Sequence, residues 1–312
     1  MVLLQVSGIH KKNERGFELK DVSFSQQWYQ QIAIAGETGS GKSTLLKIIA
    51  GLAQPDAGEV IYDGKKVIGP ADQLVPGHPK IAYLSQNFEL PHYLRVEQVL
   101  EYANKLTPKS AEQLFEICRI SHLMKRRTDQ LSGGEQQRIA VARLLIGSPG
   151  LLLMDEPYSN TDMIHKQLLK AIIGDIAEQL KISIMMVSHD PVDSLSWADE
   201  ILLMRDGRII QHGMPKEVYR HPVDNYAAGL LGKYNVWEDK NGMQRIVRPE
   251  DLILSRKHIS EVKGTVQNII FCGGYYDIEV YTETRMFTSR MMNPNIEEGD
   301  IVTISPAQHA AQ

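Results

Sequence analysis

At 312 residues, the chain is long enough to bury a full hydrophobic core and to form two domains. With 43% hydrophobic and 23% charged residues it has the composition of a soluble globular protein, and a net charge of −4 argues against a broad nucleic-acid-binding face. The sequence has no apolar run of about 18 residues that could span a membrane, and residues 1–5 lack the basic start of a signal peptide.

The N-terminal third predicts strands that lead into a nucleotide-binding core. Residues 17–24 alternate weakly between polar and apolar side chains, which indicates antiparallel strands. Residues 32–35 are short and apolar enough for a strand buried on both faces. After them, apolar residues recur at helical spacing over 45–52, and Gly51 can end that helix.

A phosphate-binding loop lies between this strand and this helix, since the stretch from residue 36 to residue 44 contains the pattern G-x-x-x-x-G-K-[ST]. Its glycines let backbone N–H groups surround phosphate oxygens, and the helix start adds the positive end of its dipole. We expect Lys42 to reach the β- and γ-phosphates and the Ser43 hydroxyl to hold Mg²⁺. The residues expected to bind nucleotide here are Gly36, Glu37, Thr38, Gly39, Ser40, Gly41, Lys42, Ser43 and Thr44.

The next segments alternate between predicted strands and predicted helices. Residues 60–67 predict a hairpin that turns at Asp-Gly, and residues 81–84 predict another buried strand. The pattern is then helical and polar to about residue 130; the basic run 125–127 fits a solvated helix end or a partner contact. Strands return at 151–154 and 182–187, which predicts a mostly parallel sheet with right-handed crossovers.

The strand at 151–154 ends in two adjacent carboxylates, Asp155 and Glu156, whose side chains point in different directions. Asp155 suits a Mg²⁺ contact beside Ser43, either direct or through a bound water. Glu156 can face the γ-phosphate and polarise a water for in-line attack. Such a pair also occurs at solvated strand ends, but the phosphate loop upstream favours catalysis.

A second glycine-tipped helix start follows Leu131, in the stretch L-S-G-G-E-Q-Q-R. Ser132 and Glu135 have the spacing of a capping box, so a helix begins at Gly133 and Gly134. Its first N–H groups are open to an anion. Facing dimers, in which each copy lends this loop to the other's nucleotide, explain two phosphate-binding starts in one chain. An ordinary capped helix would explain Ser132 and Glu135 but not two consecutive glycines.

The C-terminal part changes character after about residue 235. Before it, residues 201–210 predict a second Asp-Gly hairpin, and Pro215 begins a short helix that ends at His221. After it, short alternating runs separated by glycines predict a small all-β barrel or sandwich. We therefore expect one domain over 1–234 and a second over 235–312. The chain's cysteines, Cys118 and Cys272, fit no metal or redox spacing and indicate thiols in a reducing cytosol.

These motifs together resemble the ATP-binding cassette of ABC transporters. The resemblance covers about residues 1–230 and rests on the order and spacing of Gly36–Thr44, Gln86, Leu131–Arg138, Asp155-Glu156 and His189. It implies an α/β P-loop NTPase fold, with a RecA-like core and a helical subdomain at about residues 87–135. It also implies ATP and Mg²⁺ as the ligands.

The resemblance implies roles for individual residues. Gln86 resembles the hinge glutamine that touches Mg²⁺ and the attacking water, and His189 the switch histidine that holds the γ-phosphate and positions Glu156. Residues 159–162 match the dimer-contact loop, with a polar departure at Asn160 and Thr161. The implied catalytic residues are Glu156, His189 and Gln86; the implied Mg²⁺ ligands are Ser43, Gln86 and Asp155; the implied signature contacts to nucleotide across the dimer are Ser132, Gly133, Gly134 and Gln136.

The adenine contact is open at this point. The family stacks adenine on an aromatic residue of the first strands, and alignment by eye puts that position near Asn13. Phe17 is the nearest aromatic residue, with His10 as an alternative and a plain core role for Phe17 as another. Specificity for adenine is therefore implied by the family alone.

The tail resembles the small OB-like, TOBE-type domain that follows the cassette in importers for sugars, polyamines, ferric iron, sulfate and molybdate. The residues that carry this resemblance are Val247–Asp251, Gly264–Val266 and Gly299–Ile304. In that group the tail serves dimer contacts or regulation. OB folds also bind nucleic acid, but this tail lacks a dense basic stripe.

Taken together, the resemblance implies an ATPase subunit that powers a membrane permease for solute import by ATP-driven dimer closure. The implied partners are a second copy of the chain, integral-membrane permease subunits that dock near Gln86, and an extracytoplasmic solute-binding protein acting through the permease, but no nucleic acid. The implied location is the cytoplasmic face of the membrane, as a peripheral subunit. Two alternatives remain: a soluble ABC ATPase acting on ribosomes or DNA, disfavoured by a single cassette without heptads, and a nucleotide-gated switch not coupled to transport, disfavoured by Glu156.

Overall fold

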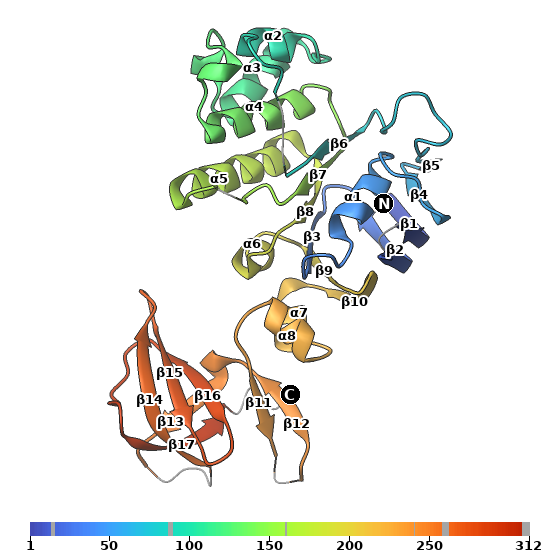
Figure 1. Ribbon diagram of the computed structural model, residues 1–312. Coiled ribbons are helices and arrows are strands. Elements are labelled where there is room, and N and C mark those ends of the chain that lie inside the picture. Colours follow the sequence, from blue (N-terminus) through green and yellow to red (C-terminus); the bar gives the residue numbers. More distant parts are fainter. Residues whose placement is uncertain (14–15, 87–89, 160, 240, 258–261, 308–312) are drawn as a thin grey trace. The chain divides into compact units, whose positions relative to one another are not determined.

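The computed structural model describes residues 1–13, 16–86, 90–159, 161–239, 241–257 and 262–307 (Figure 1). The chain divides into two compact units, Met1–Pro215 and Lys216–Gln312.

The first unit combines strands and helices in alternation. Its strands are β1 (Val2–Lys12), β2 (Glu18–Gln27), β3 (Gln31–Gly36), β4 (Ala57–Tyr62), β5 (Lys65–Lys66), β6 (Ile81–Leu84), β7 (Leu151–Asp155), β8 (Ser183–Val187), β9 (Glu200–Arg205) and β10 (Arg208–Gly213). Its helices are α1 (Lys42–Ile49), α2 (Val96–Glu101), α3 (Pro108–Ile117), α4 (Gly133–Leu145), α5 (Met163–Leu180) and α6 (Pro191–Leu195), with 3-10 turns η1 (Ser121–Leu123) and η2 (Thr128–Gln130).

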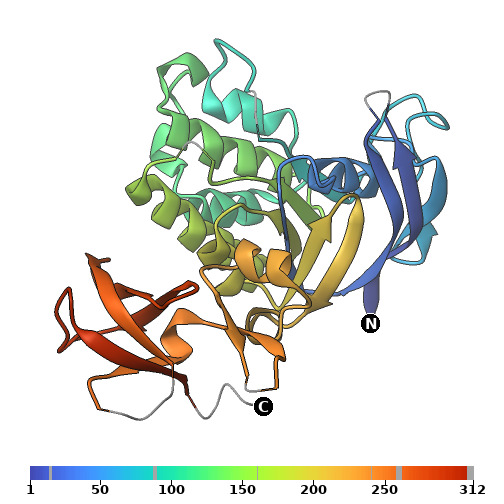
Figure 2. The same cartoon turned by 60° about the horizontal axis from the view of Figure 1, so that its bottom comes forward.

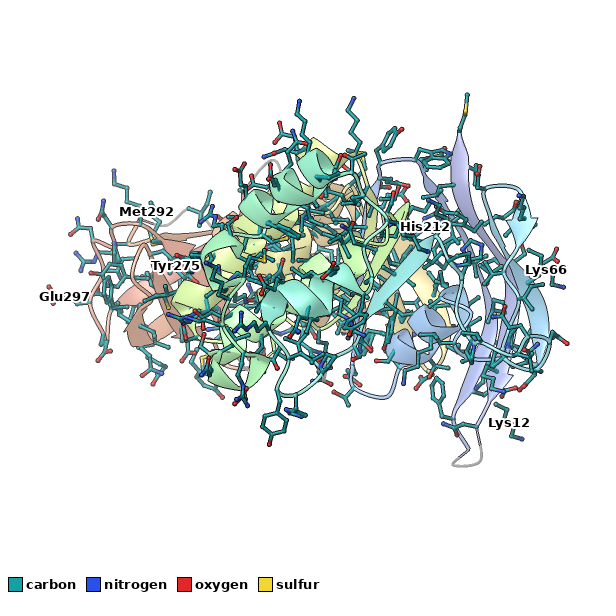
Figure 3. All side chains as sticks on the ribbon, turned by 90° about the horizontal axis from the view of Figure 1, so that it is seen from above. Lys12, Lys66, His212, Tyr275, Met292 and Glu297 are labelled. Atoms are coloured by element: carbon teal, nitrogen blue, oxygen red, sulfur yellow. The ribbon has the colours of Figure 1, made fainter. Side chains whose placement is uncertain are left out.

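The central sheet of this unit has the strand order β10-β9-β3-β8-β7-β6. Neighbours from β9 to β6 pair in parallel, and β10 is an antiparallel edge strand. The predicted mostly parallel sheet is thus confirmed. A second sheet, β2-β1-β4-β5, is antiparallel throughout, which confirms the strands expected in the first residues. Lys12 and Lys66 extend outward from this second sheet (Figure 3).

Both faces of the central sheet are covered, and strand β7 shows how. Leu151 and Leu153 pack on one face with α1 and the antiparallel sheet, while Leu152 and Met154 pack on the other with α2–α5 (Figures 1 and 2). Because successive side chains alternate between faces, a strand covered on both sides must be apolar at every position. This explains the continuous apolar runs in the sequence.

The predicted turns and helix ends are confirmed. Asp63 and Gly64, with φ of 47° and 72°, connect β4 to β5; Asp206 and Gly207, with φ of 49° and 77°, connect β9 to β10. Positive φ at both central residues matches the right-handed twist of the flanking strands. Gly51, with φ of 73°, follows the end of α1.

The second unit is built from two short helices and antiparallel strands. Its elements are α7 (Pro215–Arg220), whose first residue belongs to the first unit, α8 (Asn225–Leu230), β11 (Asn235–Glu238), β12 (Gln244–Val247), the 3-10 turn η3 (Pro249–Asp251), β13 (Leu252–Ser255), β14 (Lys263–Phe271), β15 (Tyr276–Tyr281), β16 (Met286–Met291) and β17 (Ile301–Pro306). Strands β11 and β12 form a hairpin, and the other five form a sheet ordered β13-β17-β14-β15-β16. The predicted all-β tail is confirmed from β11 onward.

Arg248 ties the two short helices to this tail. Its side chain is 2% exposed and donates to the carbonyls of Tyr219, Ala228, Gly232 and Lys233 at 2.9–3.2 Å. Carbonyls at helix C-termini lack partners within the helix, and the helix dipole favours a cation there. α7 and α8 therefore belong with the C-terminal strands, although their sequence pattern continues that of the cassette.

The predicted domain boundary between residues 234 and 235 coincides with the start of β11, whereas the compact units divide at Pro215 and Lys216. The expected helical subdomain begins at residues 87–89, which lie outside the described residues. Its described part holds α2, α3, η1 and η2; of these, α2, α3 and η1 pack with α4 and α5 around one hydrophobic cluster. The domain limits themselves stay a prediction.

Replacement of Arg248 by Met should destabilise the second unit by about 3 kcal/mol or more, since several buried carbonyls lose a charged donor. Urea unfolding followed by Trp237 fluorescence, in a background with Trp28 and Trp197 replaced by Phe, measures this. Arg256→Met is the matched control, because its half-exposed ion pair should contribute less than about 1 kcal/mol. Equal losses in the two variants would contradict the structural role of Arg248.

Candidate functional site

The candidate site lies at the carboxyl ends of three adjacent strands, β3, β8 and β7. Val187, the last residue of β8, pairs with Ile34 on one side and with Asp155 on the other, so the three strands end at one edge. The phosphate loop follows β3, Glu156 follows β7, and His189 follows β8. In parallel α/β sheets, ligands bind outside this edge.

The phosphate loop has the geometry that its glycines predict. Gly39 and Gly41 adopt φ of 88° and 104°, and a β-carbon at Gly41 would lie 2.5 Å from the side chains of Leu19 and Phe17. Position 41 thus requires glycine both for its positive φ and for the lack of space for a β-carbon. Phe17, the aromatic residue considered for adenine, is half-buried and lies against this turn.

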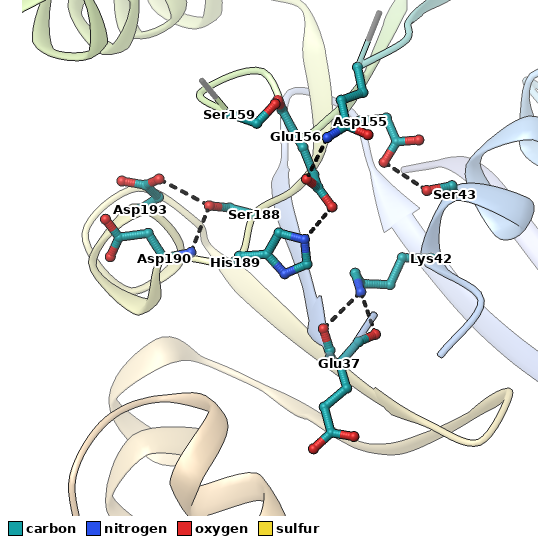
Figure 4. Close-up of polar contacts among 12 residues, drawn as sticks. Glu37, Lys42, Ser43, Asp155, Glu156, Ser159, Ser188, His189, Asp190 and Asp193 are labelled. Carbon is teal, nitrogen blue, oxygen red and sulfur yellow. Dashed lines mark hydrogen bonds and ion pairs between the residues drawn. The ribbon is translucent and has the colours of Figure 1, made fainter. Parts of the chain in front are cut away.

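Lys42 lies over the loop (Figure 4). Its Nζ donates to the carbonyls of Gly36 at 2.7 Å and Glu37 at 2.8 Å. An ammonium group has three donors, so one is left for a phosphate oxygen. Burial lowers the pKa of Lys42, while the charges of Glu156 and Asp155 oppose that shift and favour the ammonium form.

The buried hydroxyl of Ser40 provides a test of whether the loop fits a phosphate. Ser40 is 5% exposed, and its Oγ has no hydrogen-bond partner among the described protein groups. A buried polar atom without a partner is costly unless a ligand satisfies it. The loop therefore fits an anion.

Ser43 and Asp155 are in contact, as expected for a shared Mg²⁺ site. Ser43 Oγ donates to Asp155 Oδ1 at 3.0 Å, and Tyr83 Oη donates to Asp155 Oδ2 at 3.0 Å. Asp155 is 5% exposed. Hydroxyl and carboxylate oxygens are the ligands that Mg²⁺ prefers, usually with one or two protein groups and several waters, so this pair fits the ion.

Tyr83 was missed by the sequence analysis. It lies in β6 beside β7, and burial together with the Asp155 charge raises the pKa of its hydroxyl, which keeps it a donor. The only signal in the sequence was one hydroxyl within the apolar run 81–84.

The three predicted catalytic residues come together (Figure 4). Glu156 Oε1 lies in contact with His189 Nε2, and Glu156 Oε2 accepts a hydrogen bond from Gln86 Nε2 at 3.2 Å. The backbone of Glu156 has φ of 52°, and its N–H donates to the carbonyl of Val187 at 3.1 Å. A non-glycine residue in this left-handed region costs about 1 kcal/mol and is common at functional sites.

His189 is held in place by a network behind it (Figure 4). Ser188 Oγ donates to Asp193 Oδ2 at 3.0 Å and accepts from the backbone N–H of Asp190 at 3.2 Å. Lys166 Nζ bridges Asp190 at 2.6 Å and Asp193 at 3.1 Å. These contacts fix both sides of the histidine, so its ring can lie against Glu156.

The second glycine-tipped helix start forms as predicted. Ser132 Oγ accepts from the Glu135 N–H at 3.3 Å, and Glu135 Oε2 accepts from the Ser132 N–H at 2.8 Å, which confirms the capping box. This start faces a cavity of about 550 Å³. The residues that line the cavity are Gln86, Ser132, Gly133, Gly134, Gln136, Gln137, Ser159, Thr161, Asp162 and His165.

None of the described residues that line this cavity belongs to the phosphate loop. The cavity is also lined by three residues of the predicted dimer-contact loop, Ser159, Thr161 and Asp162. The fourth, Asn160, lies outside the described residues. The structure therefore brings Glu156, His189 and Gln86 to the phosphate loop's edge of the sheet. It places the predicted signature residues, Ser132, Gly133, Gly134 and Gln136, on the cavity at the start of α4, which Gln86 also lines.

Two neighbouring glutamines, Gln136 and Gln137, bind backbone carbonyls of their own subunit. Only Gln136 was predicted to have a role, as a contact to nucleotide. Gln136 Nε2 donates to the carbonyls of Thr128 at 3.4 Å and Leu131 at 3.3 Å, so its amide group holds the preceding turn. Its contact to nucleotide stays a prediction. Gln137, not singled out in the sequence, is buried and donates to the carbonyl of Pro157, which links α4 to the residue after Glu156.

A phosphate loop, a strand-end Asp-Glu pair, a histidine after the neighbouring strand and a second glycine-tipped helix start define an ABC-type nucleotide-binding cassette. Family models match accordingly: "ABC transporter" over residues 19–159 and "TOBE domain" over residues 246–312. The cassette and tail that the sequence resembled are thus both confirmed.

Curated relatives extend over most of the chain. The glucose import ATP-binding protein GlcV of Saccharolobus solfataricus is 30% identical over 92% of each chain. The sulfate/thiosulfate import ATP-binding protein CysA of Synechocystis sp. is 31% identical over 84% of this chain and 80% of its own. The molybdate/tungstate import ATP-binding protein WtpC of Thermococcus kodakarensis is 32% identical over 85% and 88%.

Solved structures show the same fold. CbiO1 of Clostridium perfringens, part of the ABC transporter complex CbiONQ, superposes with a TM-score of 0.61 at 24% identity, over 70% of this chain and 91% of its own. The ADP conformation of MJ1267, an ATP-binding cassette of an ABC transporter, superposes with a TM-score of 0.61 at 23% identity, over 74% and 98%.

The chain belongs to the ATP-binding proteins of ABC transporters, in the import group with a C-terminal TOBE domain. It is an ATPase that powers solute import together with the permease components in the membrane. Among the described residues, no helix combines the length and apolar character needed to cross a bilayer. Neither the ribosome- or DNA-directed alternative nor the uncoupled switch gains support.

Replacement of Lys42 by Ala should weaken ATP binding about 10- to 100-fold, because a charge-assisted hydrogen bond to phosphate is lost. Isothermal titration with ATP measures the change. Lys47→Ala, an exposed lysine of the same helix, should bind ATP like the parent. Unchanged affinity in Lys42→Ala would remove the phosphate-loop assignment.

Replacement of Tyr83 by Phe should raise the Mg²⁺ concentration needed for tight ATP binding several-fold, because Asp155 Oδ2 loses the donor that orients it. ATP binding in EDTA should not change. Tyr62→Phe, a buried tyrosine of the antiparallel sheet, serves as the control. The same Mg²⁺ dependence in both variants would rule out a positioning role for Tyr83.

Proposed function

We propose that two copies of the chain bind two ATP molecules between them and hydrolyse ATP with Glu156 as the general base. The observation that carries this proposal is the convergence of Glu156, His189 and Gln86 at the edge of the sheet where Lys42, Ser43 and Asp155 lie. A carboxylate held between a histidine and an amide, beside a phosphate-binding loop, has the groups that phosphoanhydride hydrolysis requires.

In this proposal the phosphate loop and Lys42 hold the β- and γ-phosphates, and Ser43, Gln86 and Asp155 hold Mg²⁺. Mg²⁺ bound there would supply positive charge against the phosphate oxygens. Glu156 accepts a proton from the attacking water, and Gln86 orients that water. His189, which contacts Glu156 in the structure, can also donate to the γ-phosphate, so it links the base to the substrate.

The dimer is supported by the separation of the two glycine-tipped helix starts. The cavity at Ser132–Gly134 contains no described residue of the phosphate loop, so one subunit does not surround a triphosphate with both. A second copy, turned to face the first, supplies the missing side to each nucleotide. Closure is favoured because the closed dimer binds ATP better than the open one.

We further propose that the permease subunits dock near Gln86 and the helical segment that follows, at the cytoplasmic face of the membrane. Gln86 touches both Glu156 and the cavity at the signature helix, so movement there would reach the catalytic base. A solute-binding protein would act through the permease. The three import relatives are named for different cargoes, glucose, sulfate/thiosulfate and molybdate/tungstate, at similar identity to this chain, which favours cargo selection outside the cassette.

Replacement of Glu156 by Gln should lower the ATPase rate at least about 100-fold, because the general base is lost while its shape is kept. The same variant should form a stable dimer with ATP, which light scattering after gel filtration detects. Glu178→Gln, at an exposed position of α5, should keep the parent rate. A Glu156→Gln protein that stays monomeric with ATP would refute the shared-site model, and ordinary turnover would remove Glu156 as the base.

A further inference from the structure

His165 lines the cavity at Ser132–Gly134, called the signature cavity from here on, but it belongs to none of the cassette motifs. Its imidazole lies against the second signature glycine: a β-carbon at Gly134 would be 2.7 Å from His165 Cδ2 and 3.5 Å from Nε2. The ring is 43% exposed and lines the same cavity as Ser132 and Gly133. A histidine therefore stands directly beside the helix start that the proposed dimer presents to a phosphate.

Asp162 determines which nitrogen of this ring carries a proton. Asp162 caps α5, where its Oδ1 accepts from the N–H groups of Ile164 and His165 at 3.0 Å. Its Oδ2 lies 2.6 Å from His165 Nδ1. These hydrogen bonds, first the one from the His165 backbone, hold the pKa of Asp162 below its usual value, so the group is a carboxylate. A carboxylate only accepts, so Nδ1 is the donor and Nε2 is the nitrogen that gains or loses a proton.

The charged groups around His165 are paired in ways that leave Nε2, on the cavity side of the ring, able to bind a ligand. Asp162, on its own turn, takes Nδ1. Glu135, from α4, is held by the Ser132 N–H and by Arg126. Lys166, on the same helix, is held by Asp190 and Asp193. Among the described residues that line the cavity, His165 is thus the one that can become a cation.

A phosphate brought into this cavity would distinguish the two states of the ring. Neutral His165 presents a lone pair at Nε2, which repels phosphate oxygens. Protonated His165 presents an N–H donor with a positive charge, and such charge-assisted hydrogen bonds are about twice as strong as neutral ones. Phosphate binding therefore favours the protonated ring.

We propose that His165 binds the terminal phosphate of the ATP held by the second copy, through Nε2, and takes up a proton as the dimer closes. This proposal rests on the proposed dimer. The sign of the pH effect follows: the contact is present when the imidazole is protonated and is lost when the imidazole is neutral. ATP-driven closure should therefore weaken as the pH rises.

The test uses the full chain with Glu156→Gln, so that hydrolysis does not interfere, and measures by analytical ultracentrifugation the ATP concentration that gives half dimer at about pH 6.5 and about pH 8.5. His165→Leu, which keeps an apolar side chain beside Gly134, should need about 10-fold more ATP at the lower pH. It should also lose most of the pH difference. His165→Arg should still dimerise at the higher pH. His122→Leu, at an exposed histidine of η1, is the matched control.

Two further measurements separate the outcomes. ATP binding to the monomer, through its own phosphate loop, should be unchanged in His165→Leu, which excludes loss of folding. All variants share His189 and the Glu156→Gln background. The effect of position 165 is therefore the difference in ATP and pH dependence between each variant and the Glu156→Gln parent. His165→Gln, which can donate but cannot titrate, should dimerise without the extra pH dependence and serves if the Leu variant folds poorly.

If the Glu156→Gln parent does not dimerise with ATP, the proposed dimer fails and the role of His165 fails with it. If the parent dimerises and the variants at position 165 follow the same ATP and pH dependence, the dimer stands and only the role of His165 is overturned.

Discussion

The parallel pairing of β3, β8 and β7 is the constraint on which the site depends. The register places Ile34, Val187 and Asp155 side by side, so three loops distant in sequence leave the sheet at one edge. Burial on both faces fixes this register, because a slip by one residue would exchange the sets of side chains that fill the two hydrophobic clusters. Catalytic geometry here is therefore a consequence of core packing.

Short polar contacts connect the cavity at Ser132–Gly134 to the sheet edge where Glu156 lies. Gln86 reaches Glu156 and also lines the signature cavity. Gln137, one turn into α4, donates to the carbonyl of Pro157, the residue after Glu156. A rigid-body shift of α4 would therefore act directly on the backbone that carries Glu156. In the proposed dimer, this contact would connect the nucleotide bound by one copy to Glu156 of the other copy.

Much of the cassette could be predicted because its signals are local. The phosphate loop, the capping box at Ser132 and the Asp-Gly turns each lie within a few consecutive residues, and apolar runs mark strands covered on both faces. Tyr83 and Arg248 could not be predicted in the same way. Tyr83 contacts a carboxylate 72 residues away, and Arg248 contacts carbonyls 15 to 29 residues away, so only the folded sheet brings these groups together. The functions of the site residues remain proposals that the placement supports.

The anchoring of α7 and α8 by Arg248 has a consequence for how such chains recombine. A C-terminal module exchanged at the start of β11 would separate both helix ends from Arg248, the residue of this chain that binds their carbonyls. An exchange at Pro215 would carry the helices, the arginine and the strands as one inherited block. Natural or engineered chimaeras of these proteins should therefore tolerate a crossover ahead of α7 better than one at the visible change in composition.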